Sequence, residues 1–162
     1  MSVFRDDILA GKVAFVTGGG SGICKGITHA FLAHGAKAAI VGRKADRLEA
    51  AAKELSEATA SECIATPADV RDPKLVEEAL EATLDRFGRI DIIVNGAAQQ
   101  GLDVLMAQLA PGGRMVFLRP HAAGAGRAFL LRKDGDAISE RALFEAAGKL
   151  IPEFAAAPAF VF

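Results

Sequence analysis

Short apolar runs alternate with amphipathic stretches along this chain, and the alternation constrains its fold more than any other feature. The run 12–17 has the length of a buried strand, whereas 44–58 is rich in Ala, Glu, Lys and Leu, which favour helix. Repeated strand–helix units build a parallel sheet with helices on both faces, so we expect a doubly wound, mostly parallel α/β fold. The expected strands are 12–17, 38–41, 62–66, 90–94, 115–118 and 159–162, and the expected helices are 22–34, 44–58, 72–87, 102–109 and 137–150.

Charge and composition narrow the classes of partner. The 19 basic and 20 acidic residues give a net charge of −1, which leaves no basic surface typical of nucleic-acid binding. No apolar run reaches the roughly 18 residues of a membrane-spanning helix. The first residues are acidic where a secretory signal would be basic, and the last three are not a Ser-Lys-Leu address, so we expect a cytoplasmic protein. The two cysteines have no metal-ligand spacing, and we expect no metal.

A glycine cluster, 18–22, lies where the first expected strand turns into the first helix. Glycines there let backbone N–H groups approach a ligand, and the helix N-terminus favours a pyrophosphate. The cluster is not a P-loop, because no Gly-Lys-Ser/Thr sequence follows it. Its position after the first strand of a βαβ unit favours a dinucleotide-binding turn, and the alternative is a tight corner without a ligand.

The end of the second expected strand distinguishes between the two nicotinamide cofactors. An acidic residue there would hold the ribose hydroxyls of NAD, but the sequence reads Gly42-Arg43-Lys44. Two cations suit the 2′-phosphate of NADP(H), unless they are solvated residues that open the second helix. We therefore expect one Rossmann-like domain over 1–162. Its dinucleotide-binding half is 1–98, and 99–162 is an abbreviated or divergent second half.

Several motifs resemble those of the short-chain dehydrogenase/reductases. The run 17–24 resembles the Thr-Gly-x-x-x-Gly-x-Gly loop, with Cys24 in place of the third glycine. Ala68-Asp69-Val70 is similar to the segment after the third strand that contacts adenine. The run 95–98 resembles the Asn-Asn-Ala-Gly motif after the fourth strand. Within the family, residues 4–98 are most similar to peroxisomal 2,4-dienoyl-CoA reductases, and 99–162 do not match well.

This resemblance implies a function and a set of residues that bind the cofactor. The implied reaction is NADPH-dependent reduction of an unsaturated acyl-CoA, and the implied location is the peroxisome. The expected partners are therefore the nucleotide and an acyl-CoA. The expected NADP(H)-binding residues are Gly18, Gly20, Ser21, Gly22, Ile23, Arg43, Lys44, Asp69, Val70, Asn95 and Gly96.

The catalytic half of the resemblance is weaker. The family uses a Tyr-x-x-x-Lys pair, in which the Tyr is the general acid, but this sequence contains no Tyr. In a loose alignment Phe129 and Lys133 take the two positions, and Phe129 has no proton to donate. His121, after the fifth expected strand, is the alternative proton donor. We expect Lys133 to position the cofactor and activity to be absent or very low, since general acid catalysis contributes about 10²–10⁴-fold.

Two further readings of the sequence stay open. The chain could be a non-catalytic Rossmann module, whether degenerate, truncated or joined near residue 98. Residues 109–117 also resemble the strand entry of class I methyltransferases, although those enzymes need an acid after the second strand, where Gly42-Arg43 stands. An exposed sheet edge near the C-terminus would favour a homo-oligomer.

Overall fold

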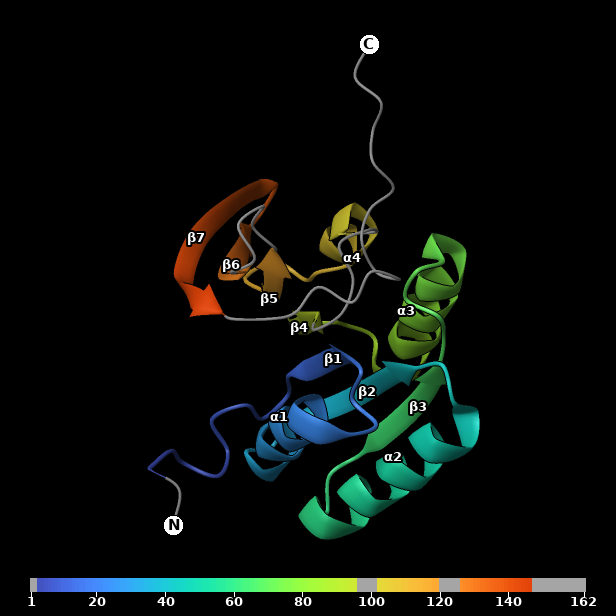
Figure 1. Ribbon diagram of the computed structural model, residues 1–162. Helices are drawn as coiled ribbons and strands as arrows, with labels where there is room; N and C mark the ends of the chain where they lie inside the picture. Colours follow the sequence, from blue (N-terminus) through green and yellow to red (C-terminus); the bar gives the residue numbers. More distant parts are fainter. Residues whose placement is uncertain (1–2, 96–101, 120–125, 147–162) are drawn as a thin grey trace.

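The computed structural model describes residues 3–95, 102–119 and 126–146 as strands, helices and the turns between them (Figure 1). The expected strands and helices over residues 12–119 are confirmed, with boundaries that differ by a few residues. The strands are β1 (Val13–Thr17), β2 (Lys37–Gly42), β3 (Cys63–Pro67), β4 (Ile92–Asn95), β5 (Arg114–Arg119), β6 (Gly126–Asp134) and β7 (Ala137–Ala146). The helices are α1 (Gly22–Ala33), α2 (Ala45–Thr59), α3 (Pro73–Phe87) and α4 (Leu102–Ala107).

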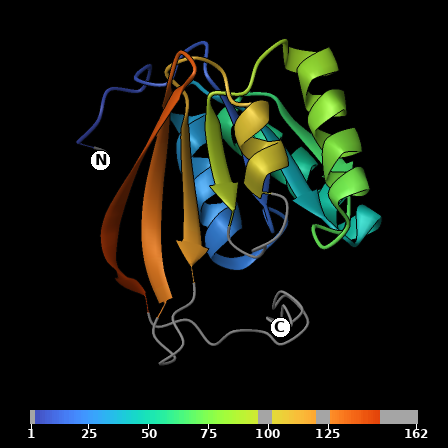
Figure 2. The ribbon, with the colours of Figure 1, turned by 90° about the horizontal axis from the view of Figure 1, so that it is seen from above.

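All seven strands join one sheet in the order β3-β2-β1-β4-β5-β6-β7. The first five pair in parallel, whereas β6 runs antiparallel to β5 and β7 antiparallel to β6. The fold is therefore Rossmann-like and mostly parallel, as the sequence predicts. In Figure 2 the arrowheads of β4 and β5 point to one edge of the sheet, and the turn between β6 and β7 lies at the opposite edge.

Two apolar cores cover the two faces of the sheet. On one face Phe15 and Ile93 pack with α3 and α4, whose contacts include Leu80 and Leu105. On the other face Val16 and its neighbours pack against α1 and α2. The side chains of β1 alternate between these two cores, which is the pattern of a central strand buried on both sides.

Helix α3 has start and stop signals that were readable in the sequence. The Asp72 carboxylate accepts a hydrogen bond from the Lys74 N–H at 3.0 Å, and Pro73 takes the first helical position. Gly88 caps the other end, where its N–H donates to the Leu84 carbonyl at 2.6 Å. At 15 residues each, α2 and α3 are the longest described helices, and none of the described helices is long and apolar enough to cross a bilayer.

The expected helix over 137–150 is wrong in its described part. Residues 137–146 form β7, which pairs along its whole length with β6, a strand that the sequence analysis did not predict. Asp134 pairs with Ala137 across a two-residue turn, so the Asp-Gly-Asp sequence is a hairpin signal that outweighs the helical spacing of the apolar residues after it. The end of that helix and the expected strand 159–162 lie outside the described residues.

Candidate functional site

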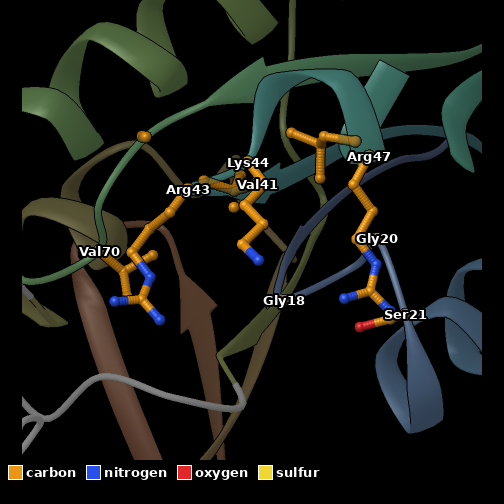
Figure 3. A pocket seen from close by; sticks show the side chains of 11 residues that line it. Gly18, Gly20, Ser21, Val41, Arg43, Lys44, Arg47 and Val70 are labelled. Carbon is orange, nitrogen blue, oxygen red and sulfur yellow. The ribbon is translucent and has the colours of Figure 1, made fainter. Parts of the chain in front are cut away.

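A cleft of about 520 Å³ opens at the carboxyl ends of β1, β2 and β3 (Figure 3). Two backbone hydrogen bonds tie these ends together. The Gly18 N–H donates to the Val41 carbonyl at 2.8 Å, and the Ala68 N–H donates to the Gly42 carbonyl at 3.0 Å. Ligands of open α/β sheets bind at this edge, so the cleft lies where the fold places a ligand.

The glycine cluster 18–22, which we call the glycine loop, borders the cleft through Gly18, Gly20 and Ser21. Gly18 has φ +70°, a conformation that a side chain would strain, and it turns the chain from β1 toward α1. Ser21 is the N-cap of α1, and its side chain makes no capping hydrogen bond. The first-turn N–H groups of α1 are therefore available to an anion at the mouth of the cleft.

Three cations also line the cleft. Arg43 and Lys44 follow β2, as the sequence analysis expected, and Arg47 lies one turn further along in the first turn of α2. The sequence analysis missed Arg47, whose only signal was its spacing of four from Arg43, which becomes informative once a helix is known to start between them. None of the described residues that line the cleft is acidic, so the described lining offers no acid of the kind that the methyltransferase reading requires.

The segment after β3 closes the cleft through Ala68 and Val70. Asp69, between them, does not line the cleft, because its carboxylate accepts hydrogen bonds from the Arg71 guanidinium at 2.9 and 3.0 Å. These bonds, with a smaller contribution from the charge of Arg43, lower the pKa of Asp69 to about 2. Val70 thus presents an apolar side chain to the cleft, and Asp69 is held in an ion pair beside it.

Asn95, Gly22 and Ile23 lie near the cleft without lining it. Asn95 is buried, and its side-chain oxygen accepts a hydrogen bond from the Thr17 hydroxyl at 3.2 Å. This bond joins the carboxyl ends of β1 and β4 beneath the glycine loop. Gly22 begins α1, and Ile23, 84% exposed, presents an apolar surface beside the loop.

Of the two expected catalytic residues, the structure describes Lys133, which does not line the cleft. Lys133 lies near the end of β6, where its N–H donates to the Gly113 carbonyl at 3.0 Å and its Nζ donates to the Ala107 carbonyl at 3.1 Å. Because β6 runs antiparallel to β5, this places Lys133 at the amino edge of the sheet, opposite the cleft. Phe129 stacks on Phe117 with 5.7 Å between ring centroids. His121 and the expected cofactor contact Gly96 lie outside the described residues.

Several known proteins are similar to this chain. A peroxisomal 2,4-dienoyl-CoA reductase from Rattus norvegicus is 46% identical over 96 residues, which are 59% of this chain and 33% of that protein. A peroxisomal 2,4-dienoyl-CoA reductase from Arabidopsis thaliana is 38% identical over 123 residues, or 76% of this chain and 41% of that one. The chain thus spans about a third of the length of the first curated relatives it matches.

A solved structure with a similar fold was determined in complex with NADP. It is a short chain dehydrogenase from Burkholderia cenocepacia, with a TM-score of 0.60, 31% identity, and coverage of 67% of this chain and 55% of that one. Residues 12–110 match the family model for short chain dehydrogenases. This match takes in more than half of the sequence, together with the glycine loop and the strands that build the cleft, and the chain belongs to the short chain dehydrogenase family.

Proposed function

We propose that this chain binds NADP(H) in the cleft at the carboxyl ends of β1 to β3. The observation that carries the proposal is the arrangement of Arg43, Lys44 and Arg47 around a cleft that the glycine loop borders, with no acid among the described residues that line it. A dianionic 2′-phosphate suits such a wall, whereas the ribose diol of NAD would find no carboxylate there.

The residues present fit the cofactor piece by piece. The N–H groups of residues 18–23 suit the pyrophosphate, the cations after β2 suit the 2′-phosphate, and Ala68 with Val70 offers an apolar surface for the adenine. The exposed Ile23 offers a second apolar surface, toward the nicotinamide. When bound, the cofactor supplies the hydride.

Likeness to 2,4-dienoyl-CoA reductases supports a reaction class, the NADPH-dependent reduction of an unsaturated acyl-CoA. These 162 residues contain no Tyr that could act as the proton donor of that reaction. With Lys133 at the far edge of the sheet, His121 is left as the proposed acid. We expect turnover by this chain alone to be about 10²–10⁴-fold below that of an enzyme with an ordered acid.

Calorimetric titration with NADPH and NADH tests the cofactor proposal. We expect micromolar binding of NADPH, weaker binding of NADH, and loss of most of the NADPH affinity in Arg43→Ala. Arg5→Ala is the matched control, because it removes the same exposed charge from the N-terminal segment, away from the cleft. Failure of the unmodified chain to bind either nucleotide would show that the glycine loop is a tight strand-to-helix turn without a ligand.

A turnover assay tests the reaction. We expect slow oxidation of NADPH with a 2,4-dienoyl-CoA, further reduced in His121→Ala and unchanged in Lys133→Ala. Binding of NADPH with no turnover of any unsaturated acyl-CoA would leave the chain as a non-catalytic NADP(H)-binding module.

A further inference from the structure

The two guanidinium groups of the cleft lie on different walls. Figure 3 shows the Arg43 side chain beside Val70, on the side of β3, whereas the Arg47 side chain extends from α2 toward Gly20 and Ser21. Lys44 lies between them. The cations therefore surround the mouth of the cleft and do not form one row along the end of β2.

The electrostatic surroundings of these cations also differ. Arg43 lies close enough to Asp69 for its charge to act on that carboxylate, which already pairs with Arg71. Arg47 and Lys44 form no ion pair with any acid in the part of the chain that the structure describes. The positive charge on the Ser21 side of the cleft is thus less compensated than that of Arg43.

We propose that Arg47 is a specificity-determining residue of this chain, which binds the 2′-phosphate of NADP(H) together with Lys44 from the glycine-loop side of the cleft. The inference rests on the proposed NADP(H) binding and adds a residue to it. The planar guanidinium of Arg47 can donate two parallel hydrogen bonds to a phosphate, and the Ser21 hydroxyl across from it can donate a third. In this arrangement Arg43 approaches the same phosphate from the other side of the cleft, beside Val70.

The competing arrangement places Arg47 on the pyrophosphate, since the glycine loop also borders it. The two arrangements differ in which ligands should bind more weakly when the Arg47 side chain is removed. A contact to the 2′-phosphate affects only ligands that have that group, whereas a contact to the pyrophosphate affects NADPH and ADP alike.

The test compares Arg47→Ala with Lys53→Ala. Lys53 lies on the same helix, outside the cleft, and its removal changes the net charge by the same amount. Binding of NADPH is measured by calorimetry, and binding of ADP by its displacement of NADPH. We expect Arg47→Ala to weaken NADPH about tenfold, as for loss of a charge-assisted hydrogen bond, and to leave ADP unchanged. We expect Lys53→Ala to change neither.

Equal weakening of NADPH and ADP in Arg47→Ala, or no weakening of either, would overturn the inference and leave NADP(H) binding intact. Absence of NADPH binding in the unmodified chain is a different result, because it overturns the proposed function and the inference with it. Arg47→Lys is a further test variant. It keeps the positive charge but loses the planar guanidinium that can donate two parallel hydrogen bonds. We expect its NADPH affinity to lie between those of the unmodified chain and Arg47→Ala.

Discussion

At the scale of single residues, the glycine loop is held against β2 with no room for a side chain at Gly19. A Cβ atom there would lie 2.5 Å from Cγ2 of Ile40 and 2.7 Å from its Cβ, and Ile40 is fully buried in the centre of the sheet. A neighbour in that position cannot yield without moving the strand. This close approach holds the loop against β2, and the neighbouring Gly18 and Gly20 line the cleft.

We expect Gly19→Ala to lower the free energy of unfolding by about 1–3 kcal/mol, because the added methyl overpacks the contact with Ile40. Gly26→Ala is the matched control. Gly26 lies exposed in α1 with nothing within 4 Å of an added Cβ, so the same change should stabilise the protein by up to about 1 kcal/mol. Urea unfolding of both variants measures the difference. Changes of the same sign would contradict the packing argument.

At the scale of elements, the hairpin of β6 and β7 is the least supported part of the described structure. Residues 137–145 are all exposed, and among the described strands β7 pairs with β6 alone. The tight turn between them requires Gly135 at φ +62°. One ion pair strengthens the hairpin from outside, since the Arg119 guanidinium lies over the Phe129 ring and donates to both carboxylate oxygens of Glu140 at 2.8 and 2.9 Å.

We expect Gly135→Val to destabilise this hairpin by about 1–2 kcal/mol, because a β-branched residue is strained at positive φ, whereas Gly135→Asn should be tolerated. No atom of the described residues lies within 4 Å of an added Cβ at this position, so the expected cost comes from backbone strain. Amide hydrogen exchange measures the effect element by element. The amides of β6 and β7 should lose protection, and those of β1 should keep it. Equal loss in all three strands would mean that the hairpin unfolds only with the rest of the sheet.

The contrast between local signals and pairing of distant strands explains which elements the sequence could predict. Strands and helices up to residue 119 follow local rules, such as the Asp72 cap or the continuous apolar run of β1. The apolar spacing of 137–150 satisfies a helix, but in the described part, 137–146, pairing with β6 decides the outcome, and pairing is not local. The residues of the site also differ in how far the sequence predicts them. Arg43 is predictable because it directly follows the end of a strand. Arg47 becomes visible only when α2 is placed beside the glycine loop.

At the scale of the whole molecule, β7 is the last strand of the described sheet and pairs with β6 on one side. In the described part of the chain nothing pairs with the outer edge of β7, on which Ile138 and Phe144 are 50% and 62% exposed. Such an edge favours pairing with another chain.

We expect concentration-dependent self-association in analytical ultracentrifugation, reduced in Phe144→Lys. Phe4→Lys is the matched control, since Phe4 is equally exposed but lies in the N-terminal segment. A monomer at all concentrations, or an equal effect of both changes, would exclude association through β7.

A buried carboxylate joins three strands at the amino edge of the sheet. Asp91 is 4% exposed and accepts hydrogen bonds from the Val13 N–H at 3.1 Å, from Lys12 Nζ at 3.2 Å and from Arg89 Nε at 2.8 Å. Its own backbone pairs with Val13 and Arg114, in β1 and β5. Burial alone would raise the pKa of Asp91, but the hydrogen bonds from Arg89, Val13 and Lys12 outweigh it, and the net shift is downward.

This downward shift makes the fold sensitive to acid. A carboxyl whose pKa is lower in the folded chain than its unfolded value of about 3.9 contributes stability above that pH, and loses it as the pH falls through the folded pKa. Asp69, with a pKa of about 2, adds to the effect in the same direction. We therefore expect the free energy of unfolding to decrease from about pH 4 downward. Asp91→Asn should lower stability at pH 7 by about 1–2 kcal/mol, because it removes the charge that accepts from the Val13 N–H, Lys12 and Arg89, although the two cations stay half-exposed to solvent, and should flatten the decrease in acid. Urea unfolding at pH 7 and pH 3 measures both quantities, and an undiminished acid slope in Asp91→Asn would assign the sensitivity to other carboxyls.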